Sequence, residues 1–224
     1  MKTLFLIQGF EVPSSRYRVL QYLPFLERAG IVPEVRAFPD AWRERRRLYR
    51  AADRYDAVFL HRKRPSGPDL NLLRRRARRI VYDVDDAVMY RDTRSGGRPF
   101  SKTRARQFAA VCRAADLVIA GNAYLAGHAR AHARAVVTIP TVLEDSRCAP
   151  RTWNGQPSRV TIGWIGDAGS VDYLERMRPV FDALAAARPD LALKIVSNRF
   201  PEGGRIPMIR KPWRAEEEME DLRS

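Results

Sequence analysis

Short loops that combine glycine, arginine and aspartate follow several apolar runs of this sequence, and they are where chemistry could occur. Five such loops begin at Gln8, His61, Asp83, Gly121 and Gly163. Backbone amides next to glycine, together with arginine side chains, bind phosphates and sugar hydroxyls. Carboxylates act as proton acceptors or ligate divalent cations. The loops therefore predict a site for a phosphorylated or hydroxyl-rich ligand.

The first loop precedes a helix that we expect to begin near Ser14. Gly9 permits close approach of the backbone, and Arg16 and Arg18 stand at the start of the helix. We predict that Gly9, Arg16 and Arg18 bind substrate through phosphate or hydroxyl groups. The alternative is an ordinary turn with exposed arginines.

The second loop follows the apolar run 55–60 and begins with His61 and Arg62. It offers a titratable imidazole beside three consecutive cations. We predict that His61 is a catalytic group and that Arg62 binds substrate. The alternative is a solvated turn.

The third loop contains three carboxylates in the pattern Asp83-Val84-Asp85-Asp86. A divalent cation would need these oxygens to converge on one point, and alternate residues of a strand face opposite ways, so convergence requires a turn. We therefore predict no metal, and assign Asp85 as a catalytic group and Asp86 as a substrate-binding group. The alternative is that these acids cap a helix or pair with the arginines at 62 and 64.

The fourth loop, Gly121-Asn122, opens a helix after an apolar run, and Asn122 is predicted to bind substrate. His128 and His132 follow at the i, i+4 spacing that zinc sites use, but no third ligand accompanies them. We expect a solvated or core histidine pair there.

The fifth loop is the glycine-rich turn at 163–170, which runs from a strand into a helix. Such turns bind a diphosphate, so Gly166 and Ser170 are predicted to contact one. The turn lacks a complete G-x-G-x-x-G pattern, which disfavours NAD.

Apolar runs and amphipathic segments alternate through the first 140 residues. Strands are expected at 2–7, 31–38, 55–60, 80–84, 117–120 and 135–139, with helices between them. This alternation predicts an α/β fold with a Rossmann-like, doubly wound parallel sheet. One domain is expected at 1–140.

The alternation stops at 141–158, which we interpret as a linker, and restarts at 159. Strands are expected at 159–165, 191–196 and 206–209, and one helix is expected at 171–188 with Leu174, Met177, Phe181 and Leu184 facing inward. Residues 159–224 are too few to close a second doubly wound sheet. We predict an incomplete second Rossmann-like domain.

Composition excludes several classes of protein. The 224 residues are 45% hydrophobic, which excludes wholesale disorder, and two cysteines exclude a disulfide scaffold and favour a reduced, cytoplasmic setting. The formal net charge is +15, and only five of the 41 basic residues are lysine. Such a charge indicates anionic partners, namely phosphorylated substrate, acidic lipid or nucleic acid. The arginines are spread along amphipathic segments, which resembles solvated helix faces more than a nucleic-acid-binding arm.

Five segments, in order, resemble bacterial GT-B glycosyltransferases of the family-4-like group (glycosyl transferases group 1). They are PSSRYRVLQYLPFLERAGI, IVYDVDDAV, AADLVIAGNAYLAGHA, VTIPTVLE and VTIGWIGDAGSVDYLERM, and they span nearly the whole chain. The resemblance implies two Rossmann-like domains, the first binding acceptor and the second binding a nucleotide-sugar donor. It also implies retention of anomeric configuration, with no metal or other cofactor.

By this resemblance, Gly9 and Arg16 would lie on the donor-phosphate side, Asp85 and Asp86 near the acceptor, and Gly166 and Ser170 at the diphosphate. The sequence departs from the family at two points. The usual basic pair of the diphosphate loop is replaced by Asp167 and Ala168. The donor-binding Glu-x7-Glu segment is expected beyond residue 224, so the resemblance implies an N-terminal portion of the enzyme.

The sequence thus predicts a glycosyltransferase that moves a sugar from a nucleotide-diphosphate sugar to a saccharide or lipid-linked acceptor. We expect it in the cytoplasm, with an anionic membrane surface as a possible docking partner and no specific nucleic acid. Two alternatives stay open: an arginine-rich nucleic-acid-binding protein, and a non-catalytic scaffold derived from a transferase.

Overall fold

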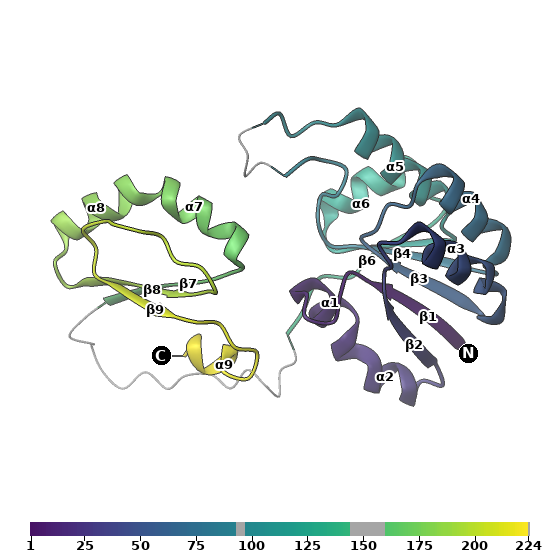
Figure 1. Cartoon of the computed structure of the whole chain (residues 1–224), viewed down its shortest axis with the longest axis horizontal. Helices are drawn as coiled ribbons and strands as arrows, with labels where there is room; N and C mark the ends of the chain where they lie inside the picture. The colour runs from purple at the N-terminus through teal and green to yellow at the C-terminus, as the bar shows by residue number, and fades with distance from the viewer. Residues whose placement is uncertain (93–96, 144–159, 224) are drawn as a thin grey trace. The chain divides into compact units, whose positions relative to one another are not determined.

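The computed structural model describes residues 1–92, 97–143 and 160–223, which form two compact units. The first is built from residues of 1–92 and 98–143 and the second from 160–223 (Figure 1). The predicted linker at 141–158 falls almost entirely outside the described residues.

The first unit is a six-stranded, fully parallel sheet in the order β2-β1-β3-β4-β5-β6. The strands are β1 (Lys2–Ile7), β2 (Val32–Ala37), β3 (Ala57–His61), β4 (Ile80–Val84), β5 (Leu117–Ala120) and β6 (Val136–Thr138). Each lies within two residues of its predicted position. The predicted α/β class and doubly wound parallel sheet are confirmed.

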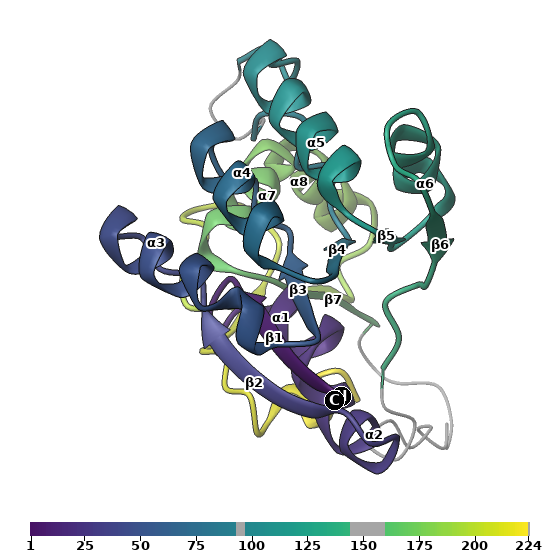
Figure 2. The same cartoon turned by 90° about the vertical axis from the view of Figure 1, so that its right-hand side faces the viewer.

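Helices cover both faces of this sheet (Figures 1 and 2). One face carries α3 (Trp42–Arg50), α4 (Gly67–Arg76), α5 (Lys102–Ala114) and α6 (Ala123–Arg130), over a core that includes Leu4, Leu60, Ile80 and Tyr82. The other carries α1 (Pro13–Arg18) and α2 (Leu23–Arg28), which pack over Phe5 and Ile7. All the strands are parallel, so their carboxyl ends meet at one edge, where the first four predicted loops lie.

The helix expected from Ser14 to Ala29 is divided into α1, a 3-10 turn (Leu20–Tyr22) and α2. Pro24 lies in the first turn of α2, where its missing N–H costs nothing, so a new helix starts there. The first helix begins at Pro13, one residue before the expected start, and Ser15 is buried inside it.

The second unit has a three-stranded parallel sheet in the order β7-β8-β9. Its strands are β7 (Val160–Ile165), β8 (Leu191–Val196) and β9 (Met208–Lys211), and its helices are α7 (Val171–Arg176), α8 (Arg178–Ala187) and the short α9 (Glu218–Asp221). The core contains Leu174, Leu191, Leu193, Ile195 and Ile206.

Of the four residues predicted to face inward from the helix at 171–188, two do so and two do not. Leu174 is buried and Phe181 packs on the core, but Met177 and Leu184 are exposed. The reason is a break at Met177, where α8 starts afresh with Pro179 in its first turn. The break changes which positions face the sheet beyond it.

Candidate functional site

A buried charged network lies at the carboxyl-terminal edge of the first sheet. Asp83 of β4 accepts hydrogen bonds from Arg18 Nε at 3.2 Å and Nη2 at 2.5 Å, and its Oδ2 lies 2.8 Å from His61 Nδ1. Register places His61 of β3 directly beside Asp83. The Arg18 and Asp83 side chains are each 2% exposed and His61 is fully buried. The network joins α1, β3 and β4 inside the protein.

Arg18 has a second anchor, because its Nη1 donates to the Ile139 carbonyl at 2.6 Å. Burial disfavours the charged guanidinium, but the hydrogen bond and charge of Asp83 outweigh it, so the pKa of Arg18 is raised. The guanidinium is thus fully engaged by the protein. This arrangement favours a positioning role for Arg18, and its predicted contact with substrate remains a prediction.

His61 presents one unused atom. Its Nε2 is buried and has no hydrogen-bond partner among the described residues. A fully buried ring does not reach a ligand at the surface, so this geometry favours His61 as support for Asp83. Its predicted catalytic role also remains a prediction.

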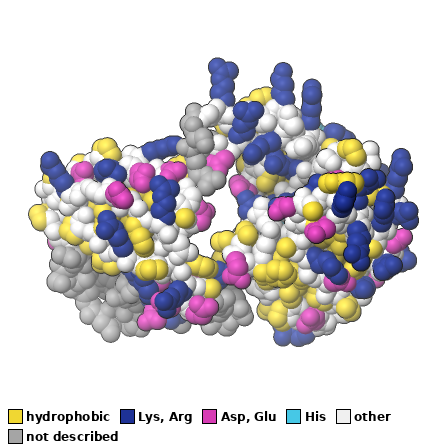
Figure 3. Space-filling model, in the orientation of Figure 1, with side chains coloured by type: hydrophobic (Ala, Val, Ile, Leu, Met, Phe, Trp, Pro, Cys, Tyr) yellow, Lys and Arg dark blue, Asp and Glu magenta, His cyan; other side chains and the backbone are white. Residues whose placement is uncertain are grey.

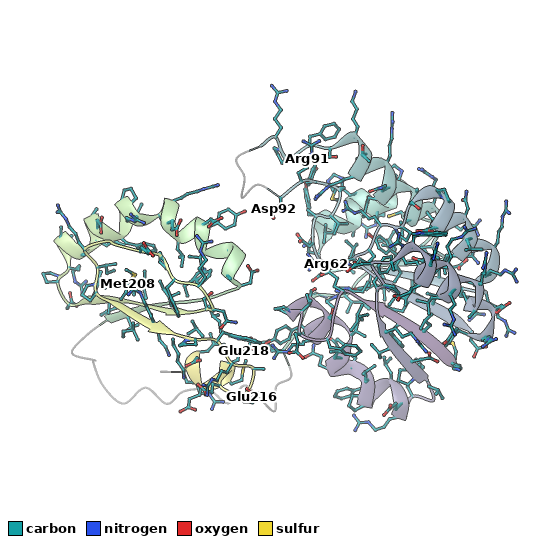
Figure 4. The ribbon with its side chains drawn as sticks, viewed as in Figure 1. Arg62, Arg91, Asp92, Met208, Glu216 and Glu218 are labelled. Atoms are coloured by element: carbon teal, nitrogen blue, oxygen red, sulfur yellow. The ribbon has the colours of Figure 1, made fainter. Side chains whose placement is uncertain are left out.

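Arg62 sits at the edge itself and is the one non-glycine residue with positive φ, 58°, in the part of the chain that is described. Its amide donates to the Asp83 carbonyl at 2.8 Å, and its side chain forms ion pairs with Asp85 and Asp86. Figure 4 labels Arg62 among the side chains of the first unit. The pairing alternative considered for these acids is therefore correct for Arg62. Left-handed backbone at such a residue marks a conformation that its surroundings impose.

Arg62 Nε and Asp85 Oδ1 lie 3.2 Å apart, close enough for an ion pair. They are nevertheless misaligned for a hydrogen bond, and both atoms are buried without a hydrogen-bond partner among the described residues. A buried polar atom without a hydrogen bond is costly, so it needs an explanation. A ligand hydroxyl beside the two groups would supply the missing hydrogen bonds.

We expect Arg62→Gly to be more stable than Arg62→Ala by about 1 kcal/mol, because the left-handed conformation costs a non-glycine residue roughly 1–2 kcal/mol. Both variants lose the same ion pairs, so their difference isolates the backbone. Urea denaturation measures this difference in the free energy of unfolding. The matched control is Lys63, whose φ is not positive. At that position, Lys63→Gly should be less stable than Lys63→Ala. Equal stability of the two Arg62 variants would refute the strain.

Glycine is required where the loops after β4 and β5 meet. A Cβ on Gly121 would stand 3.0 Å from Asp85 Cα, a backbone atom that cannot swing aside. The Gly121 amide donates to the Val84 carbonyl at 2.8 Å, which locks the approach. Asn122 then caps α6 by accepting from the Leu125 amide at 2.9 Å. Gly121 thus positions Asp85, and Asn122 has a structural task whether or not it also binds substrate.

The loop after β1 is compact. Gly9 accepts a 3.4 Å hydrogen bond from the Val12 amide, and a Cβ on Gly9 would touch Val12 at 3.3 Å. Arg16 is partly buried, with its guanidinium 5.5 Å from the Tyr17 ring centre. Both residues follow β1, which is parallel to β3, so they lie on the same edge side of the sheet as Arg62, and their binding roles stay predictions.

In the second unit, the turn after β7 holds Gly166 and Ser170. A Cβ on Gly166 would come within 2.5 Å of the Trp164 indole, so the turn needs glycine there. Asp167 accepts from the Ser170 amide at 2.9 Å. The Asp167 carboxylate therefore accepts from an amide that could otherwise donate to a phosphate. This agrees with the departure from the family at Asp167, where a basic residue is usual. A phosphate role for Gly166 and Ser170 remains a prediction.

Sequence reasoning missed the central position of Asp83 and the arginines that hold the loop after β4. Arg64 donates to the Val88 carbonyl and Arg104 to the Tyr90 carbonyl, the latter at 2.7 Å. Burial, followed by the nearby charge of Arg104, lowers the pKa of Arg64. One signal was available: an aspartate inside the apolar strand IVYDV must find a buried partner.

In the described parts of the chain, no three side chains of His, Cys, Asp or Glu converge as metal ligands would. His128 instead makes edge-on ring contacts with Tyr124 at 4.7 Å and Tyr90 at 6.1 Å between centres. Across residues 1–92, 97–143 and 160–223, every helix is too short or too polar to cross a bilayer.

The sequence matches no established protein family and no curated protein. Solved structures do match. An alpha-glucosyltransferase in complex with UDP and a 13-mer DNA aligns over 99% of this chain and 69% of its own, with a TM-score of 0.55 and 11% identity. A putative UDP-N-acetylglucosamine 2-epimerase from Listeria monocytogenes aligns over 99% and 71%, with a TM-score of 0.50 and 11% identity. At this identity the likeness shows the Rossmann-like GT-B fold.

Proposed function

We propose that the protein is a glycosyltransferase that uses a nucleotide-diphosphate sugar. The observation that carries the proposal is the unsatisfied Arg62–Asp85 pair at the carboxyl edge of the sheet, the edge at which open α/β sheets bind ligands. The likeness to a UDP-bound glucosyltransferase over 99% of the chain supports the choice of donor class. The family-4-like subtype and a retaining outcome belong to the same proposal.

In this proposal, Asp85 is the catalytic residue that accepts a hydrogen bond from the attacking hydroxyl of a saccharide or lipid-linked acceptor. Arg62 fixes the carboxylate, and Gly121 fixes the backbone beneath it. The bond between the anomeric carbon and the diphosphate breaks, and the acceptor oxygen forms the new bond. The proton leaves the hydroxyl for the carboxylate or the departing diphosphate. Orientation of the acceptor supplies much of the rate in such a scheme.

Other predicted residues take supporting places. Arg18 and His61 hold Asp83 and so position β3 and β4, and Asp86 braces Arg62. Gly9 and Arg16 are proposed at the donor side of the first unit. Gly166 and Ser170 are proposed to contact the diphosphate. No cofactor is proposed, and the nucleotide sugar is a substrate.

Saturation-transfer NMR with UDP, GDP and dTDP tests the donor class. We expect one nucleoside diphosphate to bind and to be displaced by its own sugar conjugate. Absence of binding by all three would contradict the proposal. An epimerase is the second candidate, favoured by the structural likeness to one. Incubation with a nucleotide sugar but no acceptor distinguishes the two candidates, since an epimerase changes its nucleotide sugar under those conditions and a transferase does not.

A further inference from the structure

Two adjacent helices of the first unit carry a dense set of exposed arginines. Within α3, five of nine residues are arginine and one is glutamate, and the segment from Arg74 to Arg79 adds five arginines with no acidic residue. Arg43, Arg46 and Arg50 recur at helical spacing, so they line one side of α3 over two turns, about 10 Å. Figure 3 shows the blue side chains gathered over the part of this unit where α3, α4 and α5 lie.

Ion pairs join the two helices side by side at both ends. Arg45 Nε lies 3.1 Å from Asp69 Oδ2 at the start of α4, and Arg76 Nη1 lies 3.5 Å from Asp53 beyond the end of α3. These pairs fix the relative positions of α3 and α4. Arg74 and Arg78 pair with Asp116 and Asp56.

The remaining arginines are exposed and form no ion pair with any described residue. We call them the basic face: Arg43, Arg46, Arg47, Arg50, Arg54, Arg75 and Arg79. Unlike the arginines of the candidate site, none is held by a carboxylate. A set of unpaired guanidinium groups on a convex helical surface suits a broad anionic partner rather than a small ligand.

Trp42 adds an apolar element to the basic face. The side chain begins α3 and is 54% exposed, with the guanidinium carbons of Arg43 and Arg46 at 5.6 and 5.7 Å from its ring centre. Two arginines of the basic face, Arg43 and Arg46, thus flank the Trp42 ring. An exposed indole beside arginines is typical of a side chain at a membrane–water boundary.

We propose that the basic face docks the protein on an anionic lipid surface. Charge complementarity is the argument for the lipid, since clusters of four to eight arginines or lysines on a helix favour acidic headgroups. Nucleic acid is disfavoured because the exposed indole is already flanked by guanidinium groups and so offers less ring surface for bases to stack on. The apolar side chains Leu48 and Tyr49 of α3 pack into the core, so the contact is electrostatic and shallow.

Co-sedimentation of the full chain with phosphatidylcholine vesicles, with and without phosphatidylglycerol, tests the proposal. We expect binding only to the anionic vesicles, weakening as salt rises. The triple variant R46Q/R47Q/R50Q should lower the partition coefficient about 10²-fold, at roughly 1 kcal/mol per arginine. Brominated lipids should quench the fluorescence of Trp42, and Trp42→Phe should remove that quenching.

The matched control is R28Q/R130Q/R205Q, which removes the same charge from exposed arginines outside the basic face. It should keep binding within about threefold. An equal loss of vesicle binding in both triple variants would contradict the assignment of the basic face as the docking surface, because only net charge would then matter. Tighter binding to duplex DNA than to vesicles of matched phosphate content would overturn the lipid assignment, as would no binding to vesicles. No donor is present, so failure here is distinguishable from failure of the transferase proposal.

Discussion

Asp83→Ala is expected to lower the free energy of unfolding of the first unit by about 3–5 kcal/mol. The substitution leaves the guanidinium of Arg18, 2% exposed, without its carboxylate, and it removes the partner of buried His61. An unpaired buried charge carries its full desolvation cost. Hydrogen exchange of the β3 and β4 amides measures the loss in the first unit alone.

Asp86→Ala is the matched control, because Asp86 follows the same strand but its side chain is 64% exposed. It should cost less than about 1 kcal/mol. Should Asp83→Ala fail to fold, the double variant R18M/D83L decides the matter. Replacing both charges by apolar groups should restore most of the lost stability, with the remaining cost set by buried His61, which still lacks its partner. A cost for Asp83→Ala below about 1 kcal/mol would contradict the role given to the network.

Asp85→Asn is expected to lower kcat for sugar transfer about 10²-fold with little change in the KM of the donor. The amide keeps the size of the side chain but removes the charge that Arg62 holds and the strong acceptor offered to the hydroxyl. Steady-state kinetics with varied donor and acceptor measure both constants.

Asp86→Asn is the control here as well, since it alters a carboxylate that touches the other side of Arg62. We expect its kcat to stay within about threefold, because a screened surface pair contributes little. A kcat for Asp85→Asn equal to that of the unmodified enzyme would remove Asp85 from the catalytic role and leave the fold untouched.

Most of the first sheet could be predicted because its strands are buried on both faces and therefore appear as short apolar runs. IVYDV and YDAVFL are examples, and the structure finds β4 and β3 there. Helix interruptions were harder. The break at Met177 depends on where Pro179 can restart a helix, and that choice decides whether Met177 and Leu184 face the core.

The candidate site was predictable in its location but not in its internal pairing. Strand ends fix where His61, Arg62 and Asp85 lie, because parallel strands share one carboxyl edge. Pairing depends on contacts across distant parts of the chain: Arg18 and Asp83 are 65 residues apart, and a helix and a strand bring them together. Spacing along the sequence carries no such information, so the contact of Arg18 with Asp83 could not be predicted from it.

The most direct test of the transferase proposal is mass-spectrometric analysis of transfer from UDP-, GDP- and dTDP-sugars to a panel of saccharide and lipid-phosphate acceptors. We predict that one donor is consumed only when acceptor is present, with one nucleoside diphosphate released for each glycosylated product. In the Asp85→Asn variant, we expect both the donor consumption and the glycosylated product to be lost. Consumption of a donor without acceptor, or no consumption by protein that is shown to be folded, would contradict the proposal.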